Sequence, residues 1–407
     1  MKSIIPAILF QTILIIGICL FSGCRSGDRY ADIPEHIREM EGVTIFTPDQ
    51  YSEPDTIRLV WDQSFGDIDE YFVENIYEFN VDAAGKVYIV DGSFDSRMIH
   101  VFEPDGSYLS HLGSRGEGPG EYINPGRLKF QDERLFIYDY GLNRLSSYST
   151  ESLEFLNVVS VDPERLDASG RVKDLRFLDY HFLDEGNLLL NFMKGQHYEE
   201  EEPGSDHYFR ADADLTNLKE KVLEQERLLE IWADFQGMRI MHMFPFFSKP
   251  LIAVTESGRI FAAQSEDFLI RELTPHGEEV GRFYYSVEKA KVTREDALAS
   301  TNDMNKNMVD RLELPDSWPA LQEMWTDDEE RLWISAFTEA EDEMKWWVLE
   351  PNGELIARFT WPGDRQAWPM RSVSTHKIIR DGYFYTWEEN EEGLQQVVRY
   401  LIEIGEN

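Results

Sequence analysis

Nine histidines and many carboxylates are the side chains with which this sequence could bind a metal ion or transfer protons. No two histidines have the i, i+4 spacing of helical zinc proteases, and none recurs at one position of the repeat described below. The acidic runs at 199–202 and 327–330 lack the alternating acids and the following glycine of an EF-hand loop. No Gly-x-Ser-x-Gly segment marks a serine nucleophile. The sequence therefore identifies neither catalytic residues nor metal ligands, and whether the protein is an enzyme stays open.

A segment rich in methionine and phenylalanine contains the candidate binding residues. Flexible thioethers suit adaptable apolar contacts with a protein or a small molecule. The candidates are Met238, Met241, Met243 and Phe244, and Phe246 and Phe247 follow after Pro245. The alternative is that these side chains pack against the rim of the fold, because aromatic clusters are more often core than site.

A repeated unit accounts for most of the chain. Each copy is a turn followed by alternating apolar and aromatic residues, which is typical of a strand. Six copies begin at Gly85, Glu133, Gly186, Gly258, Glu330 and Gly382. Three copies continue into a second hairpin around a Pro-x-Gly turn, in which proline presets φ and glycine accepts a positive φ. Two hairpins per unit give four short antiparallel strands, which is the blade of a β-propeller.

The ends of the repeat region predict how the ring closes. After the strand that reaches Leu401, the sixth unit has no room for a fourth strand. Residues 57–61, upstream of the first unit, form an additional strand. We expect this N-terminal strand to complete the last blade, because closure removes exposed sheet edges. The predicted fold class is all-β, a six-bladed β-propeller; a two-sheet β-sandwich is the alternative, although six similar units fit it poorly.

Two long spacings, from Gly186 to Gly258 and from Gly258 to Glu330, predict two helical insertions. The first insertion spans 215–247 and has helical apolar spacing over 218–235. The second begins with a capping-box pattern at Thr293 and should form a helix that reaches about Leu312. Because loops on rigid scaffolds often carry function, we expect residues 215–247 to cap one face of the propeller and to shape its binding surface.

The N-terminal segment predicts export. An apolar run over residues 4–20 is followed by Ser22-Gly23-Cys24, which is the arrangement of a secretory signal. The cysteine after Ser-Gly resembles the bacterial lipobox, and this resemblance implies cleavage before Cys24 and lipid attachment to its thiol. A retained transmembrane anchor is the alternative, because the apolar run is nearly long enough to span a bilayer. Both alternatives place the folded domain outside the cytoplasm, and the lipobox implies an anchor in the periplasm or at the outer membrane.

The expected organisation is a signal peptide over residues 1–23, a tether and N-terminal extension over 24–54, and the propeller over 55–407. Asp91, residues 97–102, the glycine-rich loop at 113–122 and Pro125 resemble the NHL-type repeat. The chain is similar in particular to the six-bladed propeller lipoproteins common in Bacteroidota. This resemblance implies the fold and export, and it carries no catalytic residues with it.

The charge of the chain limits its partners. It has 77 acidic and 39 basic side chains, a net charge of −38, so we expect no nucleic-acid partner. We expect a lipid-anchored binding or scaffolding module of the cell envelope, with a protein or small-molecule partner at one propeller face. The alternative is a metal-assisted hydrolase or lyase, as among six-bladed lactonase-like hydrolases. Its calcium or zinc ion would lie in the central channel, for which His100 and His376 are candidates.

Overall fold

A computed structural model of the protein distinguishes two compact units, residues 1–39 and residues 40–407. It describes residues 33–51, 54–68, 71–93, 97–183, 186–197, 202–228, 230–235, 238–301, 306–363, 365 and 377–405. The predicted signal peptide, Cys24 and His376 lie outside the described residues, so lipid attachment stays a prediction. The first unit contains one short helix, α1 (Glu35–Arg38). In the described ranges, no helix combines the length and the apolar character needed to cross a bilayer.

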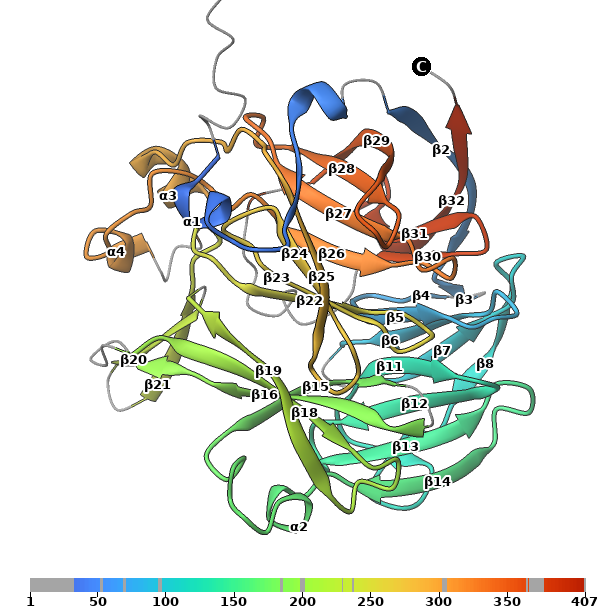
Figure 1. The fold of residues 1–407 in the computed structure, drawn as a ribbon. Helices are drawn as coiled ribbons and strands as arrows, with labels where there is room; N and C mark the ends of the chain where they lie inside the picture. The colour runs from blue at the N-terminus through green and yellow to red at the C-terminus, as the bar shows by residue number, and fades with distance from the viewer. Residues whose placement is uncertain are drawn as a thin grey trace, which may run out of the picture. The chain divides into compact units, whose positions relative to one another are not determined.

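The second unit contains six four-stranded blades, which we number along the chain (Figure 1). Blade 1 consists of β5 (Ile76–Val81), β6 (Val87–Asp91), β7 (Ile99–Phe102) and β8 (Tyr108–Leu112). Blade 2 consists of β11 (Pro125–Gln131), β12 (Arg134–Asp139), β13 (Arg144–Ser149) and β14 (Phe155–Ser160). Blade 3 consists of β15 (Arg176–Phe182), β16 (Leu188–Lys194), β18 (Gly204–Ala211) and β19 (Leu218–Arg227).

Blade 4 consists of β22 (Pro250–Val254), β23 (Ile260–Gln264), β24 (Leu269–Leu273) and β25 (Glu279–Tyr285). Its outer strand β25 also pairs in parallel with β1 (Thr44–Phe46), which belongs to the predicted N-terminal extension. Blade 5 consists of β26 (Glu323–Thr326), β27 (Leu332–Phe337), β28 (Glu343–Leu349) and β29 (Leu355–Pro362). Blade 6 consists of β30 (Lys377–Arg380), β31 (Tyr383–Glu389), β32 (Gln395–Gly405) and β2 (Asp55–Phe65).

The predicted ring closure is confirmed by strand β2. This strand pairs antiparallel with β32, with Ile57 opposite Ile404 and Phe65 opposite Val397. At its start, β2 also pairs in parallel with β29 of blade 5. One N-terminal strand therefore completes the last blade and links it to the preceding one.

The predicted hairpins are also confirmed. The turn between the first two strands of every blade contains a residue with positive φ: Gly85, Asp132, Gly186, Gly258, Glu330 and Asp381. The second hairpins of blades 1 and 5 turn at Gly106 and Gly353, with φ of 87° and 89°. Only glycine adopts this backbone conformation without strain, which is why the Pro-x-Gly segments mark these turns.

The hydrophobic core is divided among six clusters, each between two successive blades. For example, Val90 of blade 1 and Leu135 of blade 2 share one cluster, and Phe65 of blade 6 and Phe79 of blade 1 share another. The first strand of each blade lies closest to the common centre in Figure 1, where β22, β26, β30, β5, β11 and β15 meet. Face-to-face packing thus holds each blade against the next, and the first strands of the blades surround the centre.

The first predicted helix is wrong, because residues 218–227 form β19, the outer strand of blade 3. Register shifts occur where β18 pairs with β19, at Tyr208/Phe209 and at Phe209/Ala211. An irregularity of this kind interrupts the strict alternation of apolar residues along a strand. The spacing of Leu218 and Val222, both buried, consequently imitates one turn of a helix. The actual insertion is the hairpin of β20 (Glu230–Phe235) and β21 (Met238–Met243), with β17 (Gln196–His197) beside β20.

The second predicted helix begins where expected but is short. Thr293 caps α3 (Arg294–Ala299) in a capping box with Asp296. The helix ends at Ala299, and α4 (Lys306–Val309) follows instead of a continuous helix to Leu312. The Thr301 hydroxyl donates to the carbonyl oxygen of Ala297 at 2.7 Å, and such a side-chain bond competes with continued helix formation.

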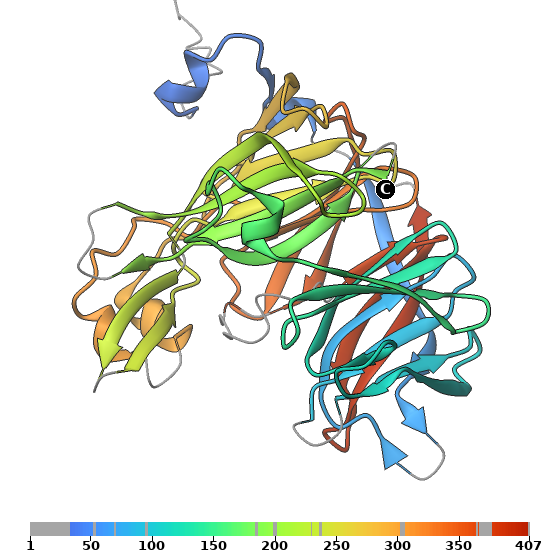
Figure 2. The ribbon, with the colours of Figure 1, turned by 90° about the horizontal axis from the view of Figure 1, so that it is seen from below.

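The two insertions pack together into what we call the accessory module, defined as the β20–β21 hairpin with residues 244–247 and the α3–α4 region 290–318. Its core contains Phe244, Phe246, Ala297, Val309 and Trp318. Figure 2 shows the hairpin, in yellow-green, beside the two orange helices. Two stretches that the sequence suggested as separate insertions thus form one body with a shared core.

Candidate functional site

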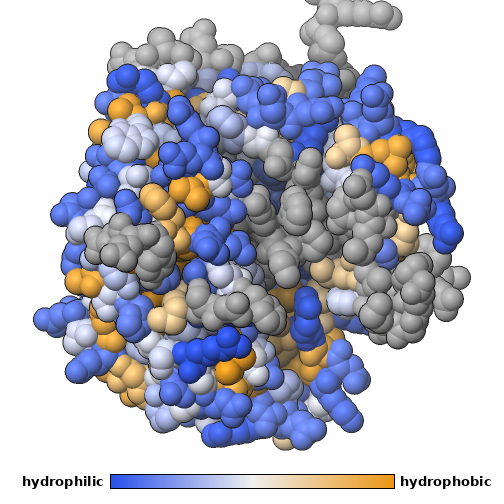
Figure 3. All heavy atoms as spheres, turned by 180° about the vertical axis from the view of Figure 1, so that it is seen from behind, coloured by the Kyte–Doolittle hydropathy of each residue, from blue (hydrophilic) through white to orange (hydrophobic). Residues whose placement is uncertain are grey.

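The candidate site is the central cavity, which has a volume of about 1430 Å³. Side chains from the first strands of all six blades line it, together with Met241, Pro245 and Phe247 of the accessory module. A space enclosed by blades and bordered by an insertion is where ligand pockets commonly occur. Outside it, the face drawn in Figure 3 is largely hydrophilic, with hydrophobic residues in small scattered groups.

The first strands of blades 1, 2 and 3 share an irregularity that shapes the cavity wall. Each has a register shift at the same place: between Ile76 and Glu78, between Gly126 and Lys129, and between Phe177 and Asp179. A bulge redirects side chains and frees backbone groups from the ladder, and bulges are frequent beside functional sites. The bulged segments of the three blades therefore present polar groups to one another and to the cavity.

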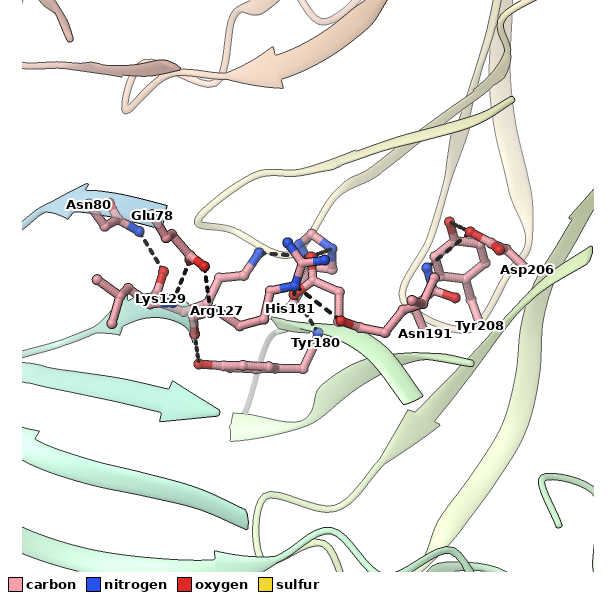
Figure 4. A network of polar contacts seen from close by, with 12 residues as sticks. Glu78, Asn80, Arg127, Lys129, Tyr180, His181, Asn191, Asp206 and Tyr208 are labelled. Carbon is pink, nitrogen blue, oxygen red and sulfur yellow. Dashed lines mark hydrogen bonds and ion pairs between the residues drawn. The ribbon is translucent and has the colours of Figure 1, made fainter. Parts of the chain in front are cut away.

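The bulges of blades 1 and 2 are joined through Glu78. Its carboxylate accepts hydrogen bonds from the backbone N–H groups of Arg127 and Leu128, both at 2.7 Å (Figure 4). The Asn80 amide donates to the carbonyl oxygen of Leu128 at 2.7 Å. Burial raises the pKa of Glu78, although Arg127 and these two N–H groups act in the opposite direction. Both carboxylate oxygens of Glu78 thus bind the first strand of blade 2.

The bulges of blades 2 and 3 are joined through Arg127 and Tyr180. Arg127 Nε donates to the carbonyl oxygen of Leu178 at 3.0 Å, and the Tyr180 hydroxyl donates to the carbonyl oxygen of Arg127 at 2.8 Å. Arg127 has a φ of 49°, in the left-handed region that a side chain other than glycine rarely adopts. Such strained residues persist only where surrounding contacts hold them. Glu78 and Tyr180 supply those contacts through the backbone of Arg127, and the bond from Nε to Leu178 positions the guanidinium.

Asp179 is the anion around which the cations gather. Arg127 Nε lies 3.7 Å and Lys129 Nζ 3.5 Å from its carboxylate oxygens. Burial raises the pKa of Asp179, but Lys129 and Arg127 lower it by more, to about 2. The carboxylate is therefore ionised at neutral pH.

His181 completes this group and is neutral at physiological pH. Its Nε2 lies 3.8 Å from Asp179 Oδ2. Burial and the positive charge of Lys129 lower the pKa of His181 to about 3. A general base is most effective when its pKa is near the working pH, so this imidazole suits hydrogen bonding better than proton transfer.

A second polar group lies on blade 3. The Asp206 carboxylate is fully buried and accepts two hydrogen bonds from Arg227, both at 2.6 Å. The Asn191 amide adds a third at 3.2 Å and the Tyr208 hydroxyl a fourth at 3.4 Å (Figure 4). A buried charge of this kind is stable only when it is paired and hydrogen-bonded. All four side chains line the cavity, where they extend its polar wall.

Blades 5 and 6 give the cavity an aromatic wall. Trp325, Trp361 and Trp387 all line it. The ring of Trp325 stacks on Trp346 with centroids 5.0 Å apart, and the ring of Trp361 meets Tyr400 edge-on at 5.0 Å. Aromatic walls that face a few fixed polar groups are typical of pockets for organic ligands.

The predicted binding residues differ in whether they line the cavity or pack in the core. Met241 is half-buried and lines the cavity, whereas Phe244 is fully buried in the core of the accessory module. Met238 and Met243 lie in β21, and the structure does not describe their side chains. Binding by these residues stays a prediction, and the burial of Phe244 matches the alternative of packing in the fold.

The alternative of a metal-assisted hydrolase or lyase requires a cluster of metal ligands. Within the described ranges, no group of three or more His, Cys, Asp or Glu side chains is arranged to hold a metal ion. His100 is buried in β7, the third strand of blade 1, and does not belong to the cavity lining.

The polar network was not apparent in the sequence because its members come from different blades. Glu78, Arg127 and Asp179 each stand in a first strand, and each is one repeat away from the next. Charged residues inside otherwise apolar strands, recurring with the period of the repeat, were the signal that would have found them.

Comparisons with known proteins agree on the fold. Residues 68–231 match the family model DUF5128, described as a 6-bladed beta-propeller. A solved structure from Bacteroides fragilis, of a protein described as exported, is 13% identical with a TM-score of 0.52, and the alignment covers 89% of this chain and 100% of that one. A DUF4221 family member from Bacteroides vulgatus is 11% identical with a TM-score of 0.54, covering 87% and 100%. No curated protein matches the sequence.

At these identities the solved structures establish the fold alone. The resemblance inferred from the repeat is confirmed by the six blades, by the closing strand and by the family match. The protein is therefore a six-bladed β-propeller, similar in fold to these Bacteroides proteins and matching the DUF5128 model across its first three blades.

Proposed function

We propose that the protein is a lipid-anchored binding module of the cell envelope, which holds an organic ligand in its central cavity. The observation that carries this proposal is the lining of the cavity, where a fixed polar wall from blades 1–3 accompanies an aromatic wall from blades 5 and 6. The ionised Asp179 and the neutral His181 suit recognition by charge and hydrogen bonds. The lipobox-like Cys24 and the export of a protein with this fold support the location.

Rigidity also favours binding over a purely scaffolding role. Glu78, Arg127 and Tyr180 hold the bulged strands of three blades in register, so the polar wall is formed before a ligand arrives. Preorganised groups lose little conformational entropy on binding. The accessory module supplies Met241, whose flexible side chain can adapt to the ligand at the border of the cavity.

Fluorine NMR of protein labelled with 5-fluorotryptophan tests the proposal. A library of small organic fragments should shift the resonances of Trp325, Trp361 and Trp387, which line the cavity. The matched controls are Trp61, which is 60% exposed on the outer strand β2, and Trp333, which is buried between blades; both should keep their positions. Each resonance is assigned by a single Trp→Phe substitution.

Two results would contradict the proposal. If the fragments shift Trp61 and leave the three cavity tryptophans unchanged, the binding surface lies on the outside of the ring. If no fragment in the library shifts a cavity tryptophan, the central cavity is not a ligand site.

A further inference from the structure

Two cationic side chains in the cavity keep hydrogen-bond donors for which the described residues supply no acceptor. Arg127 donates through Nε, and its two Nη groups make no hydrogen bond to any residue in the described ranges. The Lys129 ammonium, which has three donors, makes one long contact of 3.5 Å to Asp179 and lies 6.0 Å above the Tyr180 ring. Both residues line the cavity, so the spare donors are available to a ligand.

These two cations stand out in a chain whose net charge is −38. Two other cations of the cavity lining have close partners: Lys249 lies 2.6 Å from Glu323, and Arg227 lies 2.6 Å from Asp206. Arg127 and Lys129 instead share the single carboxylate of Asp179 at longer distances. The neutral His181 adds no charge to the group. Two cations thus share one close carboxylate, and the donors that Asp179 leaves unused remain available to another acceptor.

The backbone of Arg127 shows that its direction is fixed at a cost. A residue other than glycine in the left-handed region is strained, and Arg127 has a φ of 49°. The carboxylate of Glu78 and the hydroxyl of Tyr180 hold this conformation from the two neighbouring blades. The guanidinium fork is thus preorganised at the cavity wall, in the form that suits a planar anion.

We propose that Arg127 and Lys129 form a binding site for the carboxylate group of an organic ligand, whose apolar part lies against the aromatic residues of the cavity. A carboxylate accepts from these unused donors with one negative charge, whereas a phosphate dianion would bring two negative charges beside the ionised Asp179. This inference rests on the proposed function, since it names the ligand class of the same cavity.

Calorimetric titration of the intact protein with benzoate tests the site. Benzoate combines a carboxylate with an aromatic ring; benzyl alcohol is its neutral analogue, and inorganic phosphate is the competing type of anion. We expect benzoate to bind, to bind more weakly as NaCl is raised, and to bind at least about tenfold more tightly than either comparison compound.

Matched lysine variants identify the residue responsible. Lys129→Met should weaken benzoate binding by about tenfold or more, because a charge-assisted hydrogen bond is lost, while Lys129→Arg should restore most of the affinity. Lys345→Met is the control, since Lys345 is exposed on β28 and does not line the cavity. Thermal melting of each variant should match the parent protein, which separates a binding effect from unfolding.

The outcomes also separate this inference from the proposed function. Benzoate binding that equals that of benzyl alcohol, or that survives Lys129→Met unchanged, overturns the carboxylate site, while fragments that shift the cavity tryptophans leave the proposed function intact. Phosphate binding tighter than benzoate assigns the site to inorganic oxyanions and overturns the carboxylate. If neither benzoate nor the fragments enter the cavity, both proposals fail.

Discussion

Removing one aromatic ring at the closure of the propeller should show how much the N-terminal strand contributes to stability. Phe65, at the end of β2, is 1% exposed and packs in the cluster that joins blades 6 and 1, with Ile76 and Tyr385. The guanidinium of Arg399 lies 5.6 Å from the centre of its ring. Phe65→Ala leaves a cavity between two blades, and a buried Phe→Ala change costs about 3–5 kcal/mol.

Trp61→Ala is the matched control, because Trp61 stands in the same strand and is 60% exposed. A substitution at such a surface position changes stability by about 0.5 kcal/mol. Both free energies of unfolding are measured by urea titration, followed by circular dichroism. If the two variants lose the same stability, or if Phe65→Ala costs less than about 1 kcal/mol, β2 does not hold the ring closed and the account of closure is wrong.

Three further predictions concern other parts of the chain. The pKa of His181 is about 3 in the folded protein and near 6.5 when unfolded, so the stability due to its neutral form is complete above pH 6.5 and is lost as the pH falls toward 3. The free energy of unfolding, measured by urea titration, should therefore fall less between pH 6.5 and 4 in His181→Gln than in the parent protein, by at most about 1.4 kcal/mol per pH unit. An unchanged dependence of this free energy on pH would refute the lowered pKa of His181. Phe244→Ser should lower the melting temperature far more than Met241→Ser, because Phe244 is core of the accessory module and Met241 lines the cavity; equal losses would contradict this assignment. Cys24→Ala should abolish metabolic labelling with radioactive palmitate, and continued acylation would exclude Cys24 as the lipid site.

The fold was predictable because each blade repeats the same local signals. Positive-φ turns at positions such as Gly85 and Gly258, and the Pro-x-Gly turn at Gly106, depend on a few neighbouring residues and are legible in the sequence. The closing strand was predictable from the count of strands in the last unit. Residues 218–227 were mistaken for a helix because register shifts against β18 interrupt the alternation on which strand prediction depends.

The candidate site was not predictable to the same degree, because it exists only after the ring has formed. Glu78, Arg127 and Asp179 come together through bulges, and a bulge depends on the pairing of two strands rather than on one residue type. The methionine-rich segment was a partial guide, since Met241 lines the cavity. The apolar character of Phe244 did not distinguish a binding surface from a core.

Crystals of the protein soaked with a mixture of aromatic carboxylates test the central claim most directly, because difference density locates the ligand. We expect density inside the central cavity, with a carboxylate at Arg127 and Lys129 and a ring against the aromatic wall. Density confined to the outer strands near Trp61, or to the outer surface of the accessory module, with an empty cavity at the same soaking concentration, would contradict it.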